Sequence, residues 1–194
     1  GAPVERLRSA TRSALERLVD KALAEQVDFL LLAGDIYDRD WQDFHTGLFF
    51  RGQMVRLERA GIRCFIVQGN HDAQGVISRQ LTLPSNVTVF SSRAAQTVKL
   101  DDLSVAIHGR SFPEREVNED LVPSYPPPVS GYFNIGLLHT SLTGRAGHDT
   151  YAPTDLPTLV AKGYDYWALG HVHAREVLNE RPRIVFCGNL QGRH

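Results

Sequence analysis

Apolar and polar positions along the chain form segments of two kinds. Apolar residues recur every three to four positions between Leu7 and Leu23, which is the spacing of one face of an α-helix. A nearly continuous apolar run follows at 27–33, a second helical pattern at about 43–60, and another apolar run at 63–68. The continuous run at 27–33 is typical of a strand buried on both faces, and the run at 63–68 indicates a second strand. The order helix, strand, helix, strand predicts a parallel sheet covered by helices.

The middle and the end of the chain contain more strand candidates. They lie at 87–90, 97–100, 104–108, 133–138, 165–169, 174–178 and 183–187. A proline-rich segment at 123–131 is expected to form a stiff surface loop, and 154–162 a short helix. Because no repeat or linker interrupts the pattern, we expect one α/β domain over residues 1–194.

Composition narrows the possible partners and the compartment. The 194 residues are 42% hydrophobic and 22% charged, and 21 basic and 22 acidic side chains give a net charge of −1. Strongly basic domains are typical of nucleic-acid binding, so binding of DNA by this chain would have to depend on local patches. Cys64 and Cys187 each lie in an apolar run, which favours reduced core thiols in a cytoplasmic protein. No apolar stretch reaches the 18 residues of a membrane span.

Four short polar motifs directly follow apolar runs. They are Gly-Asp-Ile-Tyr-Asp at 34–38, Gly-Asn-His-Asp at 69–72, a lone His139, and Gly-His-Val-His at 170–173. Ligands of open α/β sheets bind beyond the carboxyl ends of the strands, and glycine permits sharp exits there. Asp, Asn and His side chains are ligands for divalent metals, and two cations about 3.5–4 Å apart can clamp an in-line phosphoryl displacement. The sequence therefore predicts a metal centre that hydrolyses phosphate esters.

The neighbours of these candidate ligands suggest further roles. His71 follows Asn70, so its side chain points elsewhere and suits proton donation to the leaving alkoxide. Asp38 is three residues beyond Asp35 and is placed to hold His71 protonated. Asp72 is expected to accept hydrogen bonds that fix the loop.

Each motif alone has an ordinary explanation. A Gly-Asp pair after a strand is usually a turn, and His-x-His at a strand end is often only exposed to solvent; four such motifs in order favour a common site. Outside the motifs, we expect no catalytic role for His45, His108 and His148. Three arginines are candidates for contacts with phosphate, although an arginine is usually a solvated surface residue. They are Arg110, Arg145 and Arg193.

These motifs resemble those of the calcineurin-like metallophosphoesterase superfamily, whose pattern is Asp-x-His, Gly-Asp-x-x-Asp, Gly-Asn-His-Asp/Glu, a lone His and Gly-His-x-His. The stretches 32–38, 136–141, 164–173 and 188–194 are similar to those of the SbcD/YhaO-like DNA repair exonucleases. The resemblance covers essentially the whole chain. It implies a layered metallophosphoesterase-like fold with central β-sheets flanked by helices.

The resemblance also implies roles for individual residues. Asp35 would bridge two divalent metal ions, usually Mn²⁺. Asn70, His139 and His171 would complete one metal site, and His173 would serve the other. By the same resemblance His71 assists the leaving group and Asp38 orients it. The implied activity is a DNA exonuclease of DNA repair that hydrolyses phosphodiester bonds with a metal-bound hydroxide. The implied partners are DNA, an SMC-like ATPase subunit and a second copy of the chain, with no membrane.

One departure from the family pattern affects the second metal. The Asp-x-His motif is absent, since the chain begins with Gly1-Ala2-Pro3 and continues into a helical pattern. We therefore expect a piece of a longer polypeptide, without the first strand and the C-terminal capping domain, and with only Asp35 and His173 for one of the two metals. Two alternatives stay open: a phosphatase or phosphodiesterase acting on a small nucleotide or phosphoprotein, and a non-catalytic scaffold for a partner ATPase.

Overall fold

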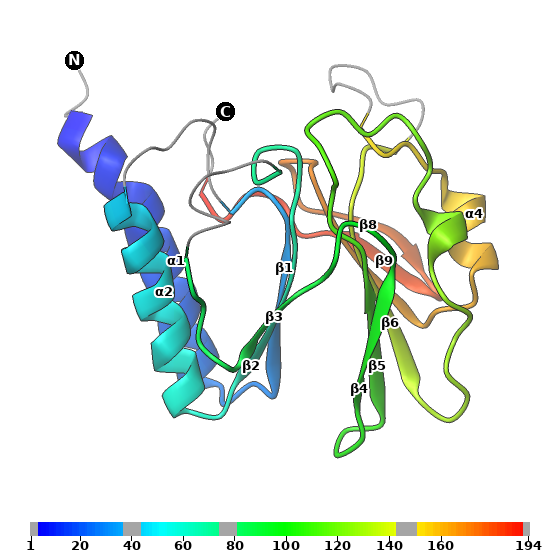
Figure 1. Cartoon of the computed structure of the whole chain (residues 1–194), viewed down its shortest axis with the longest axis horizontal. Helices are drawn as coiled ribbons and strands as arrows, with labels where there is room; N and C mark the ends of the chain where they lie inside the picture. Colours follow the sequence, from blue (N-terminus) through cyan, green and yellow to red (C-terminus); the bar gives the residue numbers. More distant parts are fainter. Residues whose placement is uncertain (1–3, 37–43, 74–80, 143–150, 192–194) are drawn as a thin grey trace.

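The computed structural model describes residues 4–36, 44–73, 81–142 and 151–191. Two β-sheets stand face to face, with a pair of long helices outside one sheet and a short helix outside the other (Figure 1). This layered α/β arrangement is the predicted fold class. No described helix has the length and apolar character needed to cross a bilayer.

The first sheet is parallel, with strand order β1-β2-β3, and it is covered by the two long helices. These elements are α1 (Val4–Ala24), β1 (Phe29–Ala33), α2 (Phe44–Arg59), β2 (Arg63–Val67) and β3 (Val87–Val89). Alternate residues of a strand point to opposite faces. Cys64 and Ile66 accordingly pack against the helices, whereas Phe65 and Val67 pack toward the second sheet. The strand predicted at 63–68 is thus observed, and it is buried on both faces.

The second sheet has the order β4-β5-β6-β7-β9-β8, in which the four central strands are parallel and both edges are antiparallel. Its elements, with the helices between them, are β4 (Gln96–Leu100), β5 (Val105–Gly109), a 3-10 turn (Val122–Ser124), β6 (Phe133–His139), α4 (Leu156–Ala161), β7 (Tyr166–Gly170), β8 (Glu176–Glu180) and β9 (Arg183–Phe186). The outer face of this sheet packs under α4, where Trp167 Nε1 donates a hydrogen bond to the carbonyl oxygen of Leu159 (3.1 Å).

The structure differs from the sequence predictions at three places. The run at 27–33 was expected to be buried on both faces, yet every residue of β1 is only half-buried, because β1 is an edge strand of the three-stranded sheet. The proline-rich loop is not purely a surface feature, since Tyr125 is buried and its hydroxyl donates to the carbonyl oxygen of Leu137 (2.8 Å). Cys64 is a buried thiol, and burial raises its pKa to about 12. The expectation for Cys187 was wrong, because it follows the last residue of β9 and is exposed.

Candidate metal centre

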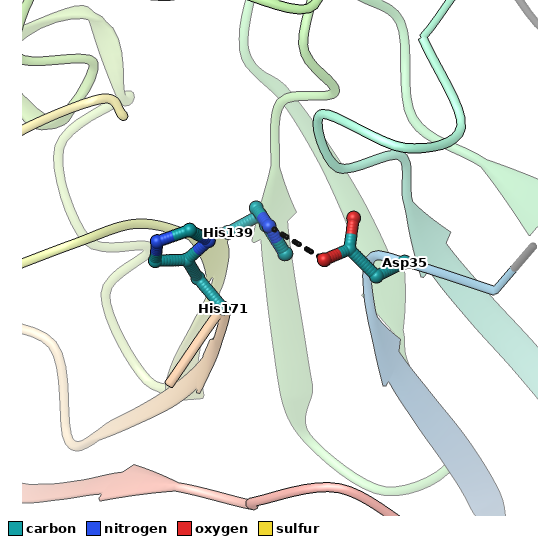
Figure 2. Close-up of side chains that lie close together, drawn as sticks. All are labelled: Asp35, His139 and His171. Atoms are coloured by element: carbon teal, nitrogen blue, oxygen red, sulfur yellow. Dashed lines mark ion pairs between the residues drawn. The ribbon is translucent and has the colours of Figure 1, made fainter. Parts of the chain in front are cut away.

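Three side chains from separate parts of the chain converge where the two sheets meet. Asp35 directly follows Gly34 at the end of β1, His139 is the last residue of β6, and His171 follows the last residue of β7. One ligand atom from each lies within 4.8 Å of the others (Figure 2). The carboxyl ends of strands from both sheets thus build one site, whereas the rule for an open α/β sheet led us to expect the edge of a single sheet.

Asn70, in the loop after β2, joins this group. His139 Nε2 lies 3.0 Å from Asn70 Oδ1 and 3.4 Å from Asp35 Oδ2. Asn70 and His139 are buried, while the Asp35 side chain keeps about a quarter of its surface exposed. Four of the five predicted ligands therefore lie together, with access from solvent on the carboxylate side.

The orientation of His139 identifies which of its nitrogen atoms faces the site. Nδ1 lies 2.8 Å from the carbonyl oxygen of Ala33. A carbonyl oxygen only accepts, so Nδ1 carries the hydrogen and the neutral ring has its lone pair on Nε2. Burial lowers the pKa of His139, against the opposing effect of the Asp35 carboxylate, which favours this neutral ring. Burial therefore keeps His139 in the form that binds metals.

The donor set fits a divalent cation. Nε2 of His139, Oδ1 of Asn70 and Oδ2 of Asp35 are all electron-pair donors that face one another, and His171 adds a second imidazole. Atoms with lone pairs that face one another in this way repel unless a positive charge lies between them. Mixed carboxylate, amide oxygen and imidazole ligands suit first-row divalent metals.

Two of the four residues have strained backbones. The φ angles of Asp35 and His171 are 52° and 91°, in the left-handed region that residues other than glycine rarely adopt. The backbone N–H of His71 donates to Asp35 Oδ1 (3.1 Å) and holds that carboxylate in place. Strain of this kind persists where surrounding contacts fix it, and it gathers at functional sites.

The glycines of the motifs serve close packing as much as sharp turns. Gly34 does adopt a positive φ of 88°, as a sharp exit requires. Gly69 does not, but a Cβ there would lie 2.5 Å from Asp35 Oδ1 and 2.7 Å from His139 Cε1. A Cβ on Gly170 would overlap the carbonyl group of Ala33. Glycine at these two positions lets β1, β2 and β7 approach one another closely enough for the ligands to meet.

Asp72 ties the two ligand-bearing loops together. Its Oδ2 accepts hydrogen bonds from the backbone N–H groups of Gly69 (3.1 Å) and Ile36 (3.2 Å), and the side chain is buried. The prediction that Asp72 fixes the loop by accepting hydrogen bonds is confirmed.

The remaining predicted site residues are placed less closely. The side chain of His71 is half-buried and that of His173 is exposed. Both are near enough to His139 that their charge lowers its pKa. His173 is not one of the three residues whose ligand atoms converge, so its role at a second metal stays a prediction. Asp38 lies outside the described residues, as do His148, Arg145 and Arg193.

Sequence reasoning missed two aromatic rings at the centre. Phe112 meets the His139 ring edge-to-face at 5.3 Å, and Tyr151 meets the His171 ring in the same way at 5.5 Å. Both lie outside helices and strands, where hydrophobic periodicity gives no signal. Arg110, a candidate for phosphate contacts, is instead engaged by the protein: its guanidinium donates to Ser124 Oγ (3.0 Å) and lies 3.7 Å from Glu119.

Comparison with known proteins finds metallophosphoesterases and nucleases among the relatives of this chain. The family model described as calcineurin-like phosphoesterase matches residues 9–175. The chain is 37% identical to the uncharacterized metallophosphoesterase YhaO of Bacillus subtilis, over 97% of this chain and 47% of that protein. It is 29% identical to the D subunit of the nuclease SbcCD of Escherichia coli K12, over 90% of this chain and 53% of that protein.

A more distant relative and a solved structure extend the comparison. The DNA double-strand break repair protein Mre11 of Methanopyrus kandleri is 25% identical, over 84% of this chain and 39% of that protein. The chain thus spans about half the length of the curated relatives it matches. The protein TT1561 of Thermus thermophilus is 13% identical with a TM-score of 0.56, over 92% of this chain and 84% of that chain, which shows a shared fold.

Proposed function

The chain belongs to the calcineurin-like phosphoesterase family, and we propose that it is the nuclease domain of a DNA repair exonuclease that hydrolyses DNA phosphodiesters. The observation that carries this proposal is the convergence of Asp35, Asn70, His139 and His171 at the carboxyl ends of four strands. The specific choice of DNA is supported by the names of two relatives, a nuclease subunit and a double-strand break repair protein.

The four converging residues would hold a divalent cation, for which we propose Mn²⁺, with a second cation at Asp35 and His173. Such cations supply Lewis-acid stabilisation of charge on phosphate oxygens and make water acidic enough to attack near neutral pH. Asp35 contributes the charge that holds them, and its carboxylate is aimed by the His71 N–H. The neutral imidazole of His139 adds a nitrogen ligand without adding repulsion.

His71 is the residue proposed to move a proton. Its imidazolium would donate a proton to the oxygen of the leaving alkoxide as the P–O bond breaks, which prevents the build-up of negative charge there. Asp38 would hold that imidazolium by charge and hydrogen bonding. His71 is next to Asn70 along the chain, so the proton donor and the metal ligand are positioned by the same loop.

A phosphatase or phosphodiesterase acting on a small substrate is the second candidate. The net charge of −1 and the engagement of Arg110 by Ser124 and Glu119 favour it, because both leave few groups to attract a polyanion.

For the intact protein we propose an SMC-like ATPase partner and a second copy of the chain as further subunits. If the protein were instead a non-catalytic scaffold for the ATPase, it would not need a bound metal.

Substrate comparison on the intact protein with Mn²⁺ tests the proposal. We expect degradation of duplex DNA from its ends, weak hydrolysis of p-nitrophenyl phosphate, and loss of DNA degradation in Asp35→Asn. Brisk hydrolysis of the small monoester or of cyclic nucleotides without DNA degradation would support the second candidate instead. Absence of bound metal and of all hydrolysis would support the scaffold.

A further inference from the structure

A cavity of about 250 Å³ opens beside the metal centre, between α2, β2 and the segment that leads into β3. Its described walls are mostly apolar and include Ile36, Phe50, Leu83 and Val89. Two polar residues, Gln68 and Asp72, also line it. No described lining residue is basic.

The cavity is joined directly to the loops that carry the ligands. Ile36 follows Asp35 in the chain, and its N–H donates to Asp72 Oδ2 (3.2 Å). The same oxygen accepts from Gly69 N–H (3.1 Å), and Gly69 precedes Asn70. Ile36 and Asp72, both in the cavity wall, are thus hydrogen-bonded to each other. Ile36 is next to Asp35 in the chain, and Asp72 is two positions beyond Asn70. A group bound in the cavity would lie next to a phosphate held at the centre.

Gln68 is firmly placed. Its backbone N–H donates to Ser111 Oγ (3.0 Å), and its carbonyl oxygen accepts from Phe112 N–H (2.9 Å). Gln68 directly follows the last residue of β2 and lines the cavity together with Ile66 of that strand. An amide side chain on a fixed backbone presents one acceptor and two donors, the arrangement that pairs with the edge of adenine.

The chemistry of the walls selects the class of occupant. The Asp72 carboxylate in the wall disfavours a phosphate. Apolar walls with the Phe50 ring suit a flat heterocycle, and a carboxylate accepts hydrogen bonds from an exocyclic amine. Resting on the proposed function, we propose that this cavity binds an amino-bearing nucleobase, adenine above all, adjacent to the scissile phosphate.

The test compares three chromogenic diesters on the intact protein with Mn²⁺. They are the 5′-p-nitrophenyl esters of deoxyadenosine and thymidine monophosphates, and methyl p-nitrophenyl phosphate, which has the same leaving group and no base. We expect kcat/KM for the deoxyadenosine ester to exceed that for the thymidine ester by roughly tenfold, in line with the usual worth of a well-formed base contact. Gln68→Leu should remove most of that preference.

A second variant fills the cavity. Leu83→Trp should lower kcat/KM for both nucleoside esters roughly tenfold or more relative to the methyl ester. Leu48→Trp is the matched control, because Leu48 is exposed on α2 and is not a lining residue, so its ratios should equal those of the wild type. Equal use of all three diesters by the wild type, or unchanged ratios in both cavity variants, would overturn the proposal. If no diester is hydrolysed at all, the proposed function itself is wrong and the cavity proposal falls with it.

Discussion

The ring of His139 is fixed from several sides. Ala33 accepts its Nδ1–H at 2.8 Å, Phe112 packs edge-on against it, and Gly69 leaves the space that its Cε1 atom occupies. A ligand held in this way loses little side-chain freedom when a metal binds. Asp35 and His171, whose φ angles are strained, lie beside this firmly packed ring.

Gly69→Ala tests this close packing. The added Cβ would lie 2.5 Å from Asp35 Oδ1 and 2.7 Å from His139 Cε1, so it must displace two ligands. We expect metal content and hydrolysis to fall steeply while circular dichroism stays that of a folded protein. The matched control is Gly52→Ala in α2, where nothing lies within 4 Å of the new Cβ. That variant should keep its activity and gain about 0.5–1 kcal/mol of stability. Full metal content in Gly69→Ala would show that the packing is not needed.

His71→Ala separates proton donation from metal binding. Its backbone N–H, which holds Asp35, remains in the variant, so metal content should stay close to that of the wild type. Turnover should fall roughly 10²–10⁴-fold, the usual contribution of a positioned acid. Asp35→Ala should lose metal and turnover together. Metal analysis and steady-state rates on the same samples check both, and a metal-free His71→Ala would mean that His71 is a ligand.

The motifs predicted which residues lie together at the centre, but not the packing that brings them together. Spacing after apolar runs predicted Asp35, Asn70, His139 and His171 as neighbours, because side chains that follow strand ends can meet beyond those ends. The strands belong to two sheets and not to one, which the spacing did not predict. It did not predict the packing role of Gly69 and Gly170, which depends on how closely two sheets approach. Nor did it predict Phe112 or Tyr151, since such contacts between irregular segments have no local sequence pattern.

Most predicted strand bounds lie within one residue of the observed ones, whereas the strand predicted at 174–178 is observed at Glu176–Glu180. The strands predicted at 133–138 and 165–169 are observed at Phe133–His139 and Tyr166–Gly170. The exposure of β1 was mispredicted, because a strand's composition does not reveal whether it lies in the middle or at the edge of its sheet.

The strand β5 carries a buried histidine that should make stability depend on pH. His108 is fully buried, with Nδ1 2.8 Å from Thr97 Oγ1 and Nε2 3.0 Å from Asn134 Oδ1. Burial lowers its pKa below the usual value of about 6.5. Between the folded and unfolded pKa values, the unfolded chain binds the proton and the folded chain does not. The stabilising contribution is therefore complete above about pH 6.5 and is lost as pH falls toward the folded pKa.

Urea unfolding at about pH 7.5 and about pH 5.5 measures this contribution. His108→Gln should be less stable than the wild type at the higher pH, because the ring stacks on Tyr164 at 4.3 Å. It should also lose less free energy of unfolding between the two pH values. His45→Gln, at an exposed position of α2, is the control and should keep the acid sensitivity of the wild type. The same loss on acidification in His108→Gln and the wild type would contradict the assignment.

For the whole molecule, the order of helices and strands in the first half predicted a parallel sheet with covering helices, which is the observed layer. The pairing of a three-stranded sheet with a six-stranded one was not predictable from local pattern, since it depends on contacts such as those of Phe65 and Val67 with Leu137. The net charge of −1 gives the chain little long-range attraction for a polyanion.

The central claim is that Asp35, Asn70, His139 and His171 form one divalent-cation site in the folded chain. Titration of the 194-residue chain with Mn²⁺, followed by equilibrium dialysis and elemental analysis, tests it most directly. We predict one firmly bound equivalent in the wild type, because the described donors converge on one point and His173 is exposed. His139→Gln should hold none, with its fold checked by circular dichroism. Firm binding of one equivalent by a folded His139→Gln, or none by the wild type, would contradict the account.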